Sequence, residues 1–185
     1  MLNFHVMIPA RLSSSRLPNK ALADIHGKPM VVRVAEQALK VAPNVMVATD
    51  HASIQAACTT HSIQSVLTSD KHESGTTRLA EAVEILGLAD DTIVVNVQGD
   101  EPMIPPELIV RVAEKLVASD APMATAAHPV HDFTEFQNPN CVKVILDKHQ
   151  NALYFSRAMI AYPRDAMLAQ DFRLPENPPL RHIGI

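Results

Sequence analysis

This chain of 185 residues has little cysteine, few aromatic residues and no excess of positive charge. Its two cysteines, Cys58 and Cys141, are far apart and form no C-x-x-C pair, which argues against a disulfide framework or a cysteine zinc site and favours a reducing compartment. Aromatic residues make up 4% with no tryptophan, which argues against stacking platforms for single-stranded nucleic acid. The net charge of -4 excludes a broadly cationic protein, so no nucleic acid polymer is expected as a partner.

Long apolar runs are also absent. None approaches the roughly 18 residues that a membrane-spanning helix needs, so no membrane insertion is expected. The apolar start of the chain has neither a basic region nor a hydrophobic stretch of signal length, and it therefore predicts a buried strand rather than a signal peptide. Because no export signal is present, the sequence predicts a cytoplasmic location. The apolar fraction of 47% is enough to build a core and excludes global disorder.

Short apolar runs and helical patterns alternate along the first part of the chain. Buried strands are predicted at 4–8, 45–48, 63–67 and 92–97, and helices at 30–40, 52–61, 77–86 and after Pro105 and Pro106. This alternation is typical of βαβ units, so we expect an α/β fold with a mostly parallel sheet covered on both faces. Beyond about residue 120, strands at 123–129, 142–147 and 152–155 predict a smaller mixed or antiparallel extension. Residues 162–179 are predicted to be loop, and a strand that begins at 182 suggests that the sequence stops short of the natural end.

The segment after the first strand, residues 9–20, concentrates three cations, Arg11, Arg16 and Lys20, with three serines. Ligands in open α/β sheets bind at the carboxyl ends of the strands. The segment lacks glycine, so it is neither a Walker loop nor a dinucleotide fingerprint. Its guanidinium, ammonium and hydroxyl groups could still surround a polyphosphate. A solvated loop whose charges aid solubility accounts for the same residues equally well.

Two further segments follow predicted strands. Asp100 comes directly after a buried strand, next to a glycine, and suits Mg²⁺, which prefers one or two carboxylates plus phosphate oxygens and water. Asp100 could instead cap a turn.

In the other segment, Ser74 or Thr76 could cap the helix that follows, and the free amides at that helix start suit an anion or a base edge. Plain capping without a ligand is the simpler explanation there.

The motifs of these segments, in their order along the chain, resemble those of a known family. Pro9-Ala10-Arg11, Arg16-Leu17-Pro18-x-Lys20 and Gly27-Lys28-Pro29-Met30 resemble the opening signature of sugar nucleotidyltransferases that act on acidic sugars. The other matching motifs are Ala48-Thr49-Asp50, Ser74-Gly75-Thr76-x-Arg78, Asn96-Val97-Gln98-Gly99-Asp100-Glu101-Pro102, Asn138-Pro139-Asn140-x-Val142-Lys143, Tyr154-Phe155-Ser156-Arg157 and Arg181-His182-Ile183-Gly184-Ile185. Together they resemble the 3-deoxy-manno-octulosonate (Kdo) cytidylyltransferases, or CMP-Kdo synthetases, over essentially the whole chain.

The resemblance implies a Rossmann-like nucleotide-diphospho-sugar transferase fold, with residues 1–120 as the nucleotide-binding part and 121–185 as a truncated sugar-binding extension of the same domain. It implies a homodimeric enzyme that uses CTP and Mg²⁺ to activate Kdo for lipopolysaccharide assembly, with CMP-Kdo and pyrophosphate as products. A cytidylyltransferase for another acidic sugar, such as a sialic acid, and a non-catalytic nucleotide-binding domain are the alternatives. The motifs around Asp100 and His182 favour Kdo.

The resemblance also implies roles for individual residues. Arg11, Lys20 and Asp100 are the predicted catalytic residues, with the two cations at the triphosphate and Asp100 as the magnesium ligand. The predicted nucleotide-binding residues are Ala10, Arg11, Arg16, Lys20, Ser74, Gly75 and Arg78. The predicted sugar-binding residues, where a cation should meet the Kdo carboxylate, are Gln98, Arg157, Arg164 and His182.

The sequence departs from the family in two places. The family's Ile-Pro element is replaced by Ile160-Ala161-Tyr162-Pro163, in which the proline is shifted by two positions just before Arg164. Family members also continue past the final Gly184-Ile185 pair, into a stretch that supplies a second metal-binding aspartate, sugar contacts and much of the dimer surface.

Overall fold

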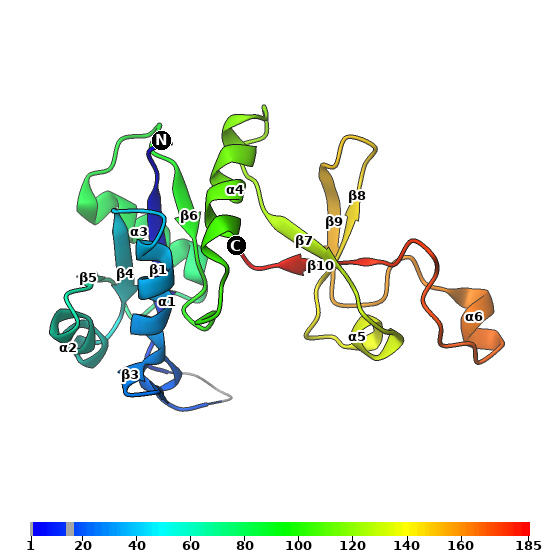
Figure 1. The fold of residues 1–185 in the computed structure, drawn as a ribbon, viewed down its shortest axis with the longest axis horizontal. Coiled ribbons are helices and arrows are strands. Elements are labelled where there is room, and N and C mark those ends of the chain that lie inside the picture. Colours follow the sequence, from blue (N-terminus) through cyan, green and yellow to red (C-terminus); the bar gives the residue numbers. More distant parts are fainter. Residues whose placement is uncertain (1, 14–16) are drawn as a thin grey trace. The chain divides into compact units, whose positions relative to one another are not determined.

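The structure is a computed structural model that describes residues 2–13 and 17–185. It divides into two compact units, one made of the residues up to Ala124 together with Ile185, the other of Thr125–Gly184. Figure 1 labels the elements of both units. Among the described residues no helix is both long and apolar enough to cross a membrane.

The first unit is built on a four-stranded parallel sheet in the order β5-β4-β1-β6. Its strands are β1 (His5–Ala10), β4 (Val45–Thr49), β5 (Gln64–Leu67) and β6 (Val94–Asn96). Along β1, Val6, Met7 and Ile8 are all fully buried, because both faces of a central parallel strand are covered. The predicted parallel α/β sheet is confirmed, although β6 is shorter than the predicted strand at 92–97.

Helices cover both faces of this sheet. They are α1 (Met30–Leu39), α2 (Ala52–Thr60), α3 (Gly75–Leu86) and α4 (Pro106–Val117). Successive strand residues point to opposite faces. Val6 and Ile8 accordingly pack in one cluster with buried residues of α1 and α4, whereas Met7 packs in another with Leu79 and Ala82 of α3. The helix α3 therefore lies on the face opposite α1 and α4, and its N-terminus points to the same sheet edge as the end of β1 (Figure 1).

A short 3-10 helix, η1 (Lys20–Leu22), and a small hairpin lead from the end of β1 into α1. The hairpin pairs β2 (Asp24–Ile25) with β3 (Lys28–Pro29). Its two turn residues, His26 and Gly27, both have positive φ, as a two-residue turn that matches the strand twist requires. The sequence pattern did not predict these elements, because two-residue strands are too short to show a period.

The second unit contains an antiparallel sheet in the order β7-β10-β8-β9. Its strands are β7 (Ala126–Pro129), β8 (Lys143–Leu146), β9 (Ala152–Ser156) and β10 (Leu180–Ile183). The smaller antiparallel part of the predicted fold is confirmed, and within the described ranges it forms a sheet of its own. Two short helices, α5 (Phe133–Gln137) and α6 (Arg164–Leu168), accompany it. The prediction that 162–179 is entirely loop is wrong at α6.

Candidate functional site

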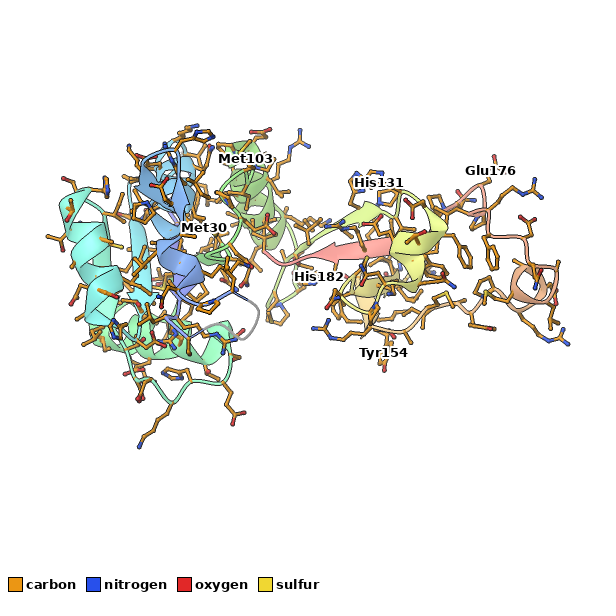
Figure 2. All side chains as sticks on the ribbon, turned by 90° about the horizontal axis from the view of Figure 1, so that it is seen from below. Met30, Met103, His131, Tyr154, Glu176 and His182 are labelled. Atoms are coloured by element: carbon orange, nitrogen blue, oxygen red, sulfur yellow. The ribbon has the colours of Figure 1, made fainter. Side chains whose placement is uncertain are left out.

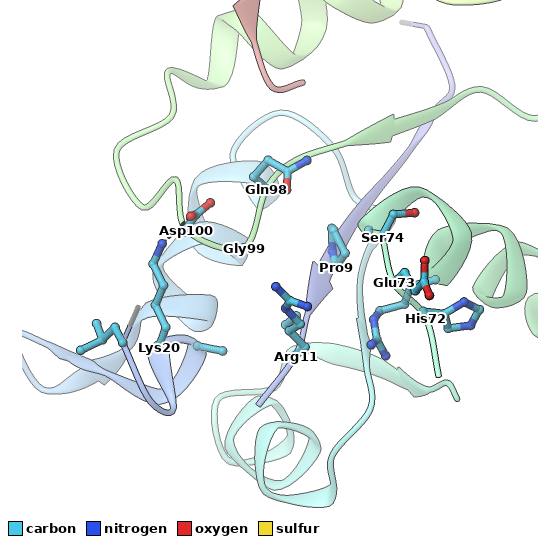
Figure 3. Close-up of a pocket in the computed structure, with 14 residues that line it drawn as sticks. Pro9, Arg11, Lys20, His72, Glu73, Ser74, Gln98, Gly99 and Asp100 are labelled. Carbon is cyan, nitrogen blue, oxygen red and sulfur yellow. Dashed lines mark hydrogen bonds and ion pairs between the residues drawn. The ribbon is translucent and has the colours of Figure 1, made fainter. Parts of the chain in front are cut away.

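A pocket of about 410 Å³ lies in the first unit, at the carboxyl end of the parallel sheet. This is the place where open α/β sheets bind ligands. Its walls come from the end of β1, from η1, from the start of α3 and from the loop after β6 (Figure 3). The lining residues are Pro9, Ala10, Arg11, Leu17, Lys20, Ala21, His72, Glu73, Ser74, Gly75, Arg78, Gln98, Gly99 and Asp100. The pocket thus collects every predicted nucleotide-binding residue except Arg16, which lies outside the described residues.

Two glycines let the walls close onto the end of β1. A Cβ atom placed on Gly99 would lie 2.7 Å from the backbone oxygen of Pro9. A Cβ atom on Gly75 would lie 3.1 Å from Cγ of the Pro9 ring. The first distance is too short for any side chain, so glycine is required for the loop after β6 to reach β1. The close packing brings Asp100 and the start of α3 to the two sides of Pro9.

Two cations enter this pocket. Arg11 follows β1 directly and is exposed, and Lys20 begins η1. In Figure 3 both side chains reach toward the side of the pocket where Gln98 and Asp100 lie. The Lys20 ammonium forms an ion pair with the Asp100 carboxylate, and the two side chains are 33% and 44% exposed. A pair this exposed contributes little to stability and can rearrange when a ligand enters.

The donor set around Asp100 fits a magnesium ion that binds together with substrate phosphates. Within the part of the chain that the structure describes, no group of three or more His, Cys, Asp or Glu side chains forms a metal cage. Mg²⁺ does not need one, because it usually keeps water ligands and takes one or two carboxylates plus phosphate oxygens. Asp100 supplies one carboxylate at the pocket wall, beside the cations that a triphosphate would meet.

The start of α3 forms the opposite wall. Ser74 is the N-cap residue, and its hydroxyl oxygen accepts a hydrogen bond from the backbone N–H of Thr77 at 3.1 Å. The helix consequently begins at Gly75, two residues earlier than predicted. The capping function that the sequence suggested for Ser74 is therefore present. The positive end of the helix and its first amides also face the pocket, which favours an anionic ligand.

Arg78 lines the pocket, but its guanidinium is held in a buried network. Its Nη2 donates to Asp50 Oδ2 at 2.9 Å, and its Nη1 donates to Thr68 Oγ1 at 2.7 Å. The other oxygen of Asp50 accepts the backbone N–H of Leu12 at 3.0 Å. Arg78 is only 2% exposed. The network joins the segments that follow β1, β4 and β5 to α3, so Arg78 braces the loop that carries Arg11 in addition to any contact with a ligand.

Asp50 was missed as a functional residue, although it stands in the matched Ala48-Thr49-Asp50 motif. The available signal was its position directly after β4, at the same sheet edge as the other polar residues. What the sequence could not show is that its carboxylate bridges Leu12 and Arg78.

We expect Asp50→Asn to lower the free energy of unfolding by about 3 kcal/mol, because it leaves the buried Arg78 guanidinium without its counter-charge. It should also raise the KM for nucleotide, since the loop that follows β1 loses its anchor at Leu12. Chemical denaturation and steady-state kinetics measure the two effects. Asp91→Asn, at an exposed turn of the same unit, is the matched control. Unchanged values for both quantities would contradict the bracing role.

A hydrogen bond between two side chains also supports the wall next to Ser74. His72 Nε2 is paired with Glu81 on α3, and the same Glu81 oxygen accepts the backbone N–H of Ser69 at 2.8 Å. The hydrogen bond from His72, followed by that from Ser69, keeps the pKa of Glu81 below its usual value. The segment before α3 is thereby tied to the helix that it precedes.

The predicted sugar-binding residues are divided between the two units. Gln98 lines the pocket of the first unit. In the second unit, Arg157 donates from Nη1 to the Pro139 carbonyl at 2.9 Å. Arg164, at the start of α6, is largely exposed and is paired with Asp165 at 3.1 Å. His182 lies on β10 (Figure 2). Its Nε2 is 2.8 Å from Thr125 Oγ1, and its ring meets the Phe155 ring edge-on with 4.9 Å between the centroids.

Burial lowers the pKa of His182. The unfolded chain therefore takes up this proton first, and stability should decrease as the pH falls below the ordinary imidazole pKa of about 6.5. We expect His182→Gln to flatten the dependence of the melting temperature on pH between about 7.5 and about 5.5. The carboxylates with lowered pKa act in a more acidic range, so they do not mask the effect. Equal slopes for the variant and the unmodified protein would contradict this assignment.

Comparisons with known proteins show the family of this chain. A family described as cytidylyltransferase matches residues 5–185. A 3-deoxy-manno-octulosonate cytidylyltransferase of Neisseria meningitidis serogroup A is 65% identical over all of this chain and 74% of its own length. One of the same name from Herminiimonas arsenicoxydans is 54% identical over the same shares.

A solved structure from the same family also matches this chain. It is described as CMP:2-keto-3-deoxy-manno-octonic acid synthetase complexed with CTP, and it matches with a TM-score of 0.85 and 39% identity, covering 99% of this chain and 72% of that one. The sheet topology and the matches over the whole of this chain support the same family. The chain belongs to the cytidylyltransferase family, and within that family to the 3-deoxy-manno-octulosonate cytidylyltransferases.

Proposed function

We propose that this protein transfers a cytidylyl group from CTP to Kdo, giving CMP-Kdo and pyrophosphate for lipopolysaccharide assembly. The observation that carries the proposal is the pocket in which Arg11, Lys20 and Asp100 meet at the end of the parallel sheet. The names of the relatives and the CTP complex of the matching structure support the choice of both substrates. In this proposal Arg11, Lys20 and Asp100 are the catalytic residues for cytidylyl transfer.

The reaction needs mainly positioning and neutralisation of charge. The anomeric hydroxyl of Kdo attacks the α-phosphorus of CTP and loses its proton, an oxygen–phosphorus bond forms, and the bond to the β-phosphate oxygen breaks as pyrophosphate leaves. Arg11 and Lys20 bind the triphosphate, and Lys20 exchanges its ion pair with Asp100 for a phosphate oxygen. The amides at the start of α3 and the backbone at Ala10 complete the nucleotide site.

Asp100 would hold Mg²⁺ in this proposal. When bound, Mg²⁺ supplies charge neutralisation at the phosphate oxygens. The carboxylate has the position for this role, since it lies at the pocket wall and its present partner, Lys20, is a partly exposed side chain. Further parts of the proposal are the sugar-side roles of Gln98, Arg157, Arg164 and His182, the division of roles at about residue 120, a homodimeric assembly and a cytoplasmic location. They are supported by the resemblance of the motifs.

A comparison of sugars tests the proposal. Pyrophosphate release is measured with CTP, Mg²⁺ and either Kdo or N-acetylneuraminate. We expect kcat/KM for Kdo to exceed that for the sialic acid by about 100-fold or more, because a site built to pair polar groups of one sugar leaves them unpaired with another. A preference for the sialic acid would support a different sugar specificity. Binding of CTP without any pyrophosphate release would support a non-catalytic nucleotide-binding domain.

A further inference from the structure

Lys143, the first residue of β8, is a buried cation that the proposed chemistry does not use. Its side chain is fully buried, and its residue exposure is 0%. The ammonium Nζ donates three hydrogen bonds, all to backbone carbonyls: to Cys141 at 2.6 Å, to Arg157 at 2.9 Å and to Asn138 at 3.0 Å. An ammonium group has three N–H donors, so each of them is satisfied. A lysine held in this way is built into the unit, unlike a lysine on a solvated surface.

Two of these carbonyls belong to one turn. The backbone N–H of Cys141 donates to the Asn138 carbonyl at 3.0 Å, and that of Asn140 donates to the Asn138 side chain at 2.9 Å. Lys143 bonds to the carbonyls at both ends of the turn, Asn138 and Cys141. One of the two carbonyls between them, that of Pro139, accepts a hydrogen bond from the Arg157 guanidinium. Lys143 therefore fixes the turn that holds the Arg157 side chain.

The third carbonyl belongs to Arg157 itself. Arg157 follows the end of β9, where Ser156 is paired with Lys143 in the antiparallel ladder. One ammonium thus fixes the backbone of Arg157 and, through the turn, the acceptor of its guanidinium. A guanidinium has five N–H donors, and the hydrogen bond from Arg157 to the Pro139 carbonyl uses only one of them, on Nη1. The remaining fork can meet a carboxylate, which pairs best with two parallel N–H groups.

We propose that Lys143 is a positioning residue that sets the Arg157 guanidinium for the carboxylate of the acidic sugar. The inference rests on the proposed function, in which Arg157 lies on the sugar side. Lys143 does not touch the substrate, and its effect passes through Arg157. A purely structural lysine would instead affect stability and both substrates alike.

A double-mutant cycle tests this coupling. Kinetic constants for Kdo and CTP are measured for the unmodified enzyme, for Lys143→Met, for Arg157→Ala and for the double variant. Lys148→Met, in the exposed turn after β8, is the matched control. Methionine fills nearly the same volume as lysine but donates no hydrogen bond. Melting curves for each variant report whether the fold is retained, and Lys143→Gln, which keeps a donor group, replaces the methionine variant if that one does not fold.

We expect Arg157→Ala to raise the KM for Kdo by about 50-fold and Lys143→Met by about 10-fold, each with the KM for CTP changed less than about twofold. The double variant should match Arg157→Ala alone, because the two residues act through one contact. The inference is wrong, while the proposed function stands, if the two increases in KM for Kdo multiply in the double variant. It is also wrong if Lys143→Met changes the KM for Kdo and the KM for CTP equally, or changes neither. If Arg157→Ala spares Kdo, the sugar-side role of Arg157 and this inference both fail. An unmodified enzyme that makes no CMP-Kdo would refute the proposed function itself.

Discussion

Replacing Lys20 with alanine is expected to lower kcat for CMP-Kdo formation by about 100-fold to 1,000-fold, the usual effect of removing one charged or hydrogen-bonding group that stabilises a transition state. Lys20 reaches into the pocket and is paired with Asp100, so its ammonium is available for the triphosphate whose charge shifts to the leaving pyrophosphate. The ion pair is partly exposed, so the free energy of unfolding should change by less than about 1 kcal/mol.

Lys40→Ala is the matched control for this variant, because Lys40, the C-cap residue of α1, is exposed and lies outside the pocket. Steady-state kinetics and denaturation curves are recorded for both variants. A Lys20→Ala enzyme with unchanged turnover and unchanged affinity for CTP would remove Lys20 from the site.

Asp100→Asn is expected to lower turnover by about 1,000-fold at fixed Mg²⁺, because Asp100 is the proposed Mg²⁺ ligand and the loss of such a ligand removes several kcal/mol of charge stabilisation at the phosphorus. Asparagine keeps the shape of the side chain. The Asp100 side chain is 44% exposed and its partner Lys20 is 33% exposed, so the melting temperature should barely change. Turnover is titrated with Mg²⁺, and thermal stability is measured on the same preparation.

The alternative for Asp100 is that it only caps the turn after β6. That role predicts the reverse result, a lower melting temperature with activity retained and a normal dependence on Mg²⁺. Asp91→Asn, at an exposed turn of the same unit, controls for the loss of one surface charge.

The parallel sheet and its helices could be predicted because burial on both faces leaves a continuous signal in the sequence. β1 and β4 are short runs of branched apolar residues, and α1 carries an apolar stripe of the helical period. The helix α6 leaves no such signal, since it has five residues and none of them is buried. The segments of the pocket could also be predicted, because they follow strands whose ends meet at one edge of the sheet.

The contacts within the pocket depend on residues far apart in the chain, so the sequence could not show them. The close approach of Gly99 to the Pro9 carbonyl brings the loop after β6 against the end of β1. In the second unit, the burial of Lys143 likewise depends on the backbone carbonyls of Asn138, Cys141 and Arg157, which accept its three hydrogen bonds. A lysine is almost never fully buried unless its donors are satisfied, and a sequence shows only that a lysine stands in a strand.

The most direct test of the proposed reaction is phosphorus NMR of the enzyme with CTP, Kdo and Mg²⁺. Attack at the α-phosphorus predicts that the three CTP resonances give way to one phosphodiester resonance of CMP-Kdo and one pyrophosphate resonance, with one pyrophosphate formed for each CMP-Kdo. Unchanged CTP, or the appearance of CDP with inorganic phosphate, would contradict cytidylyl transfer to Kdo.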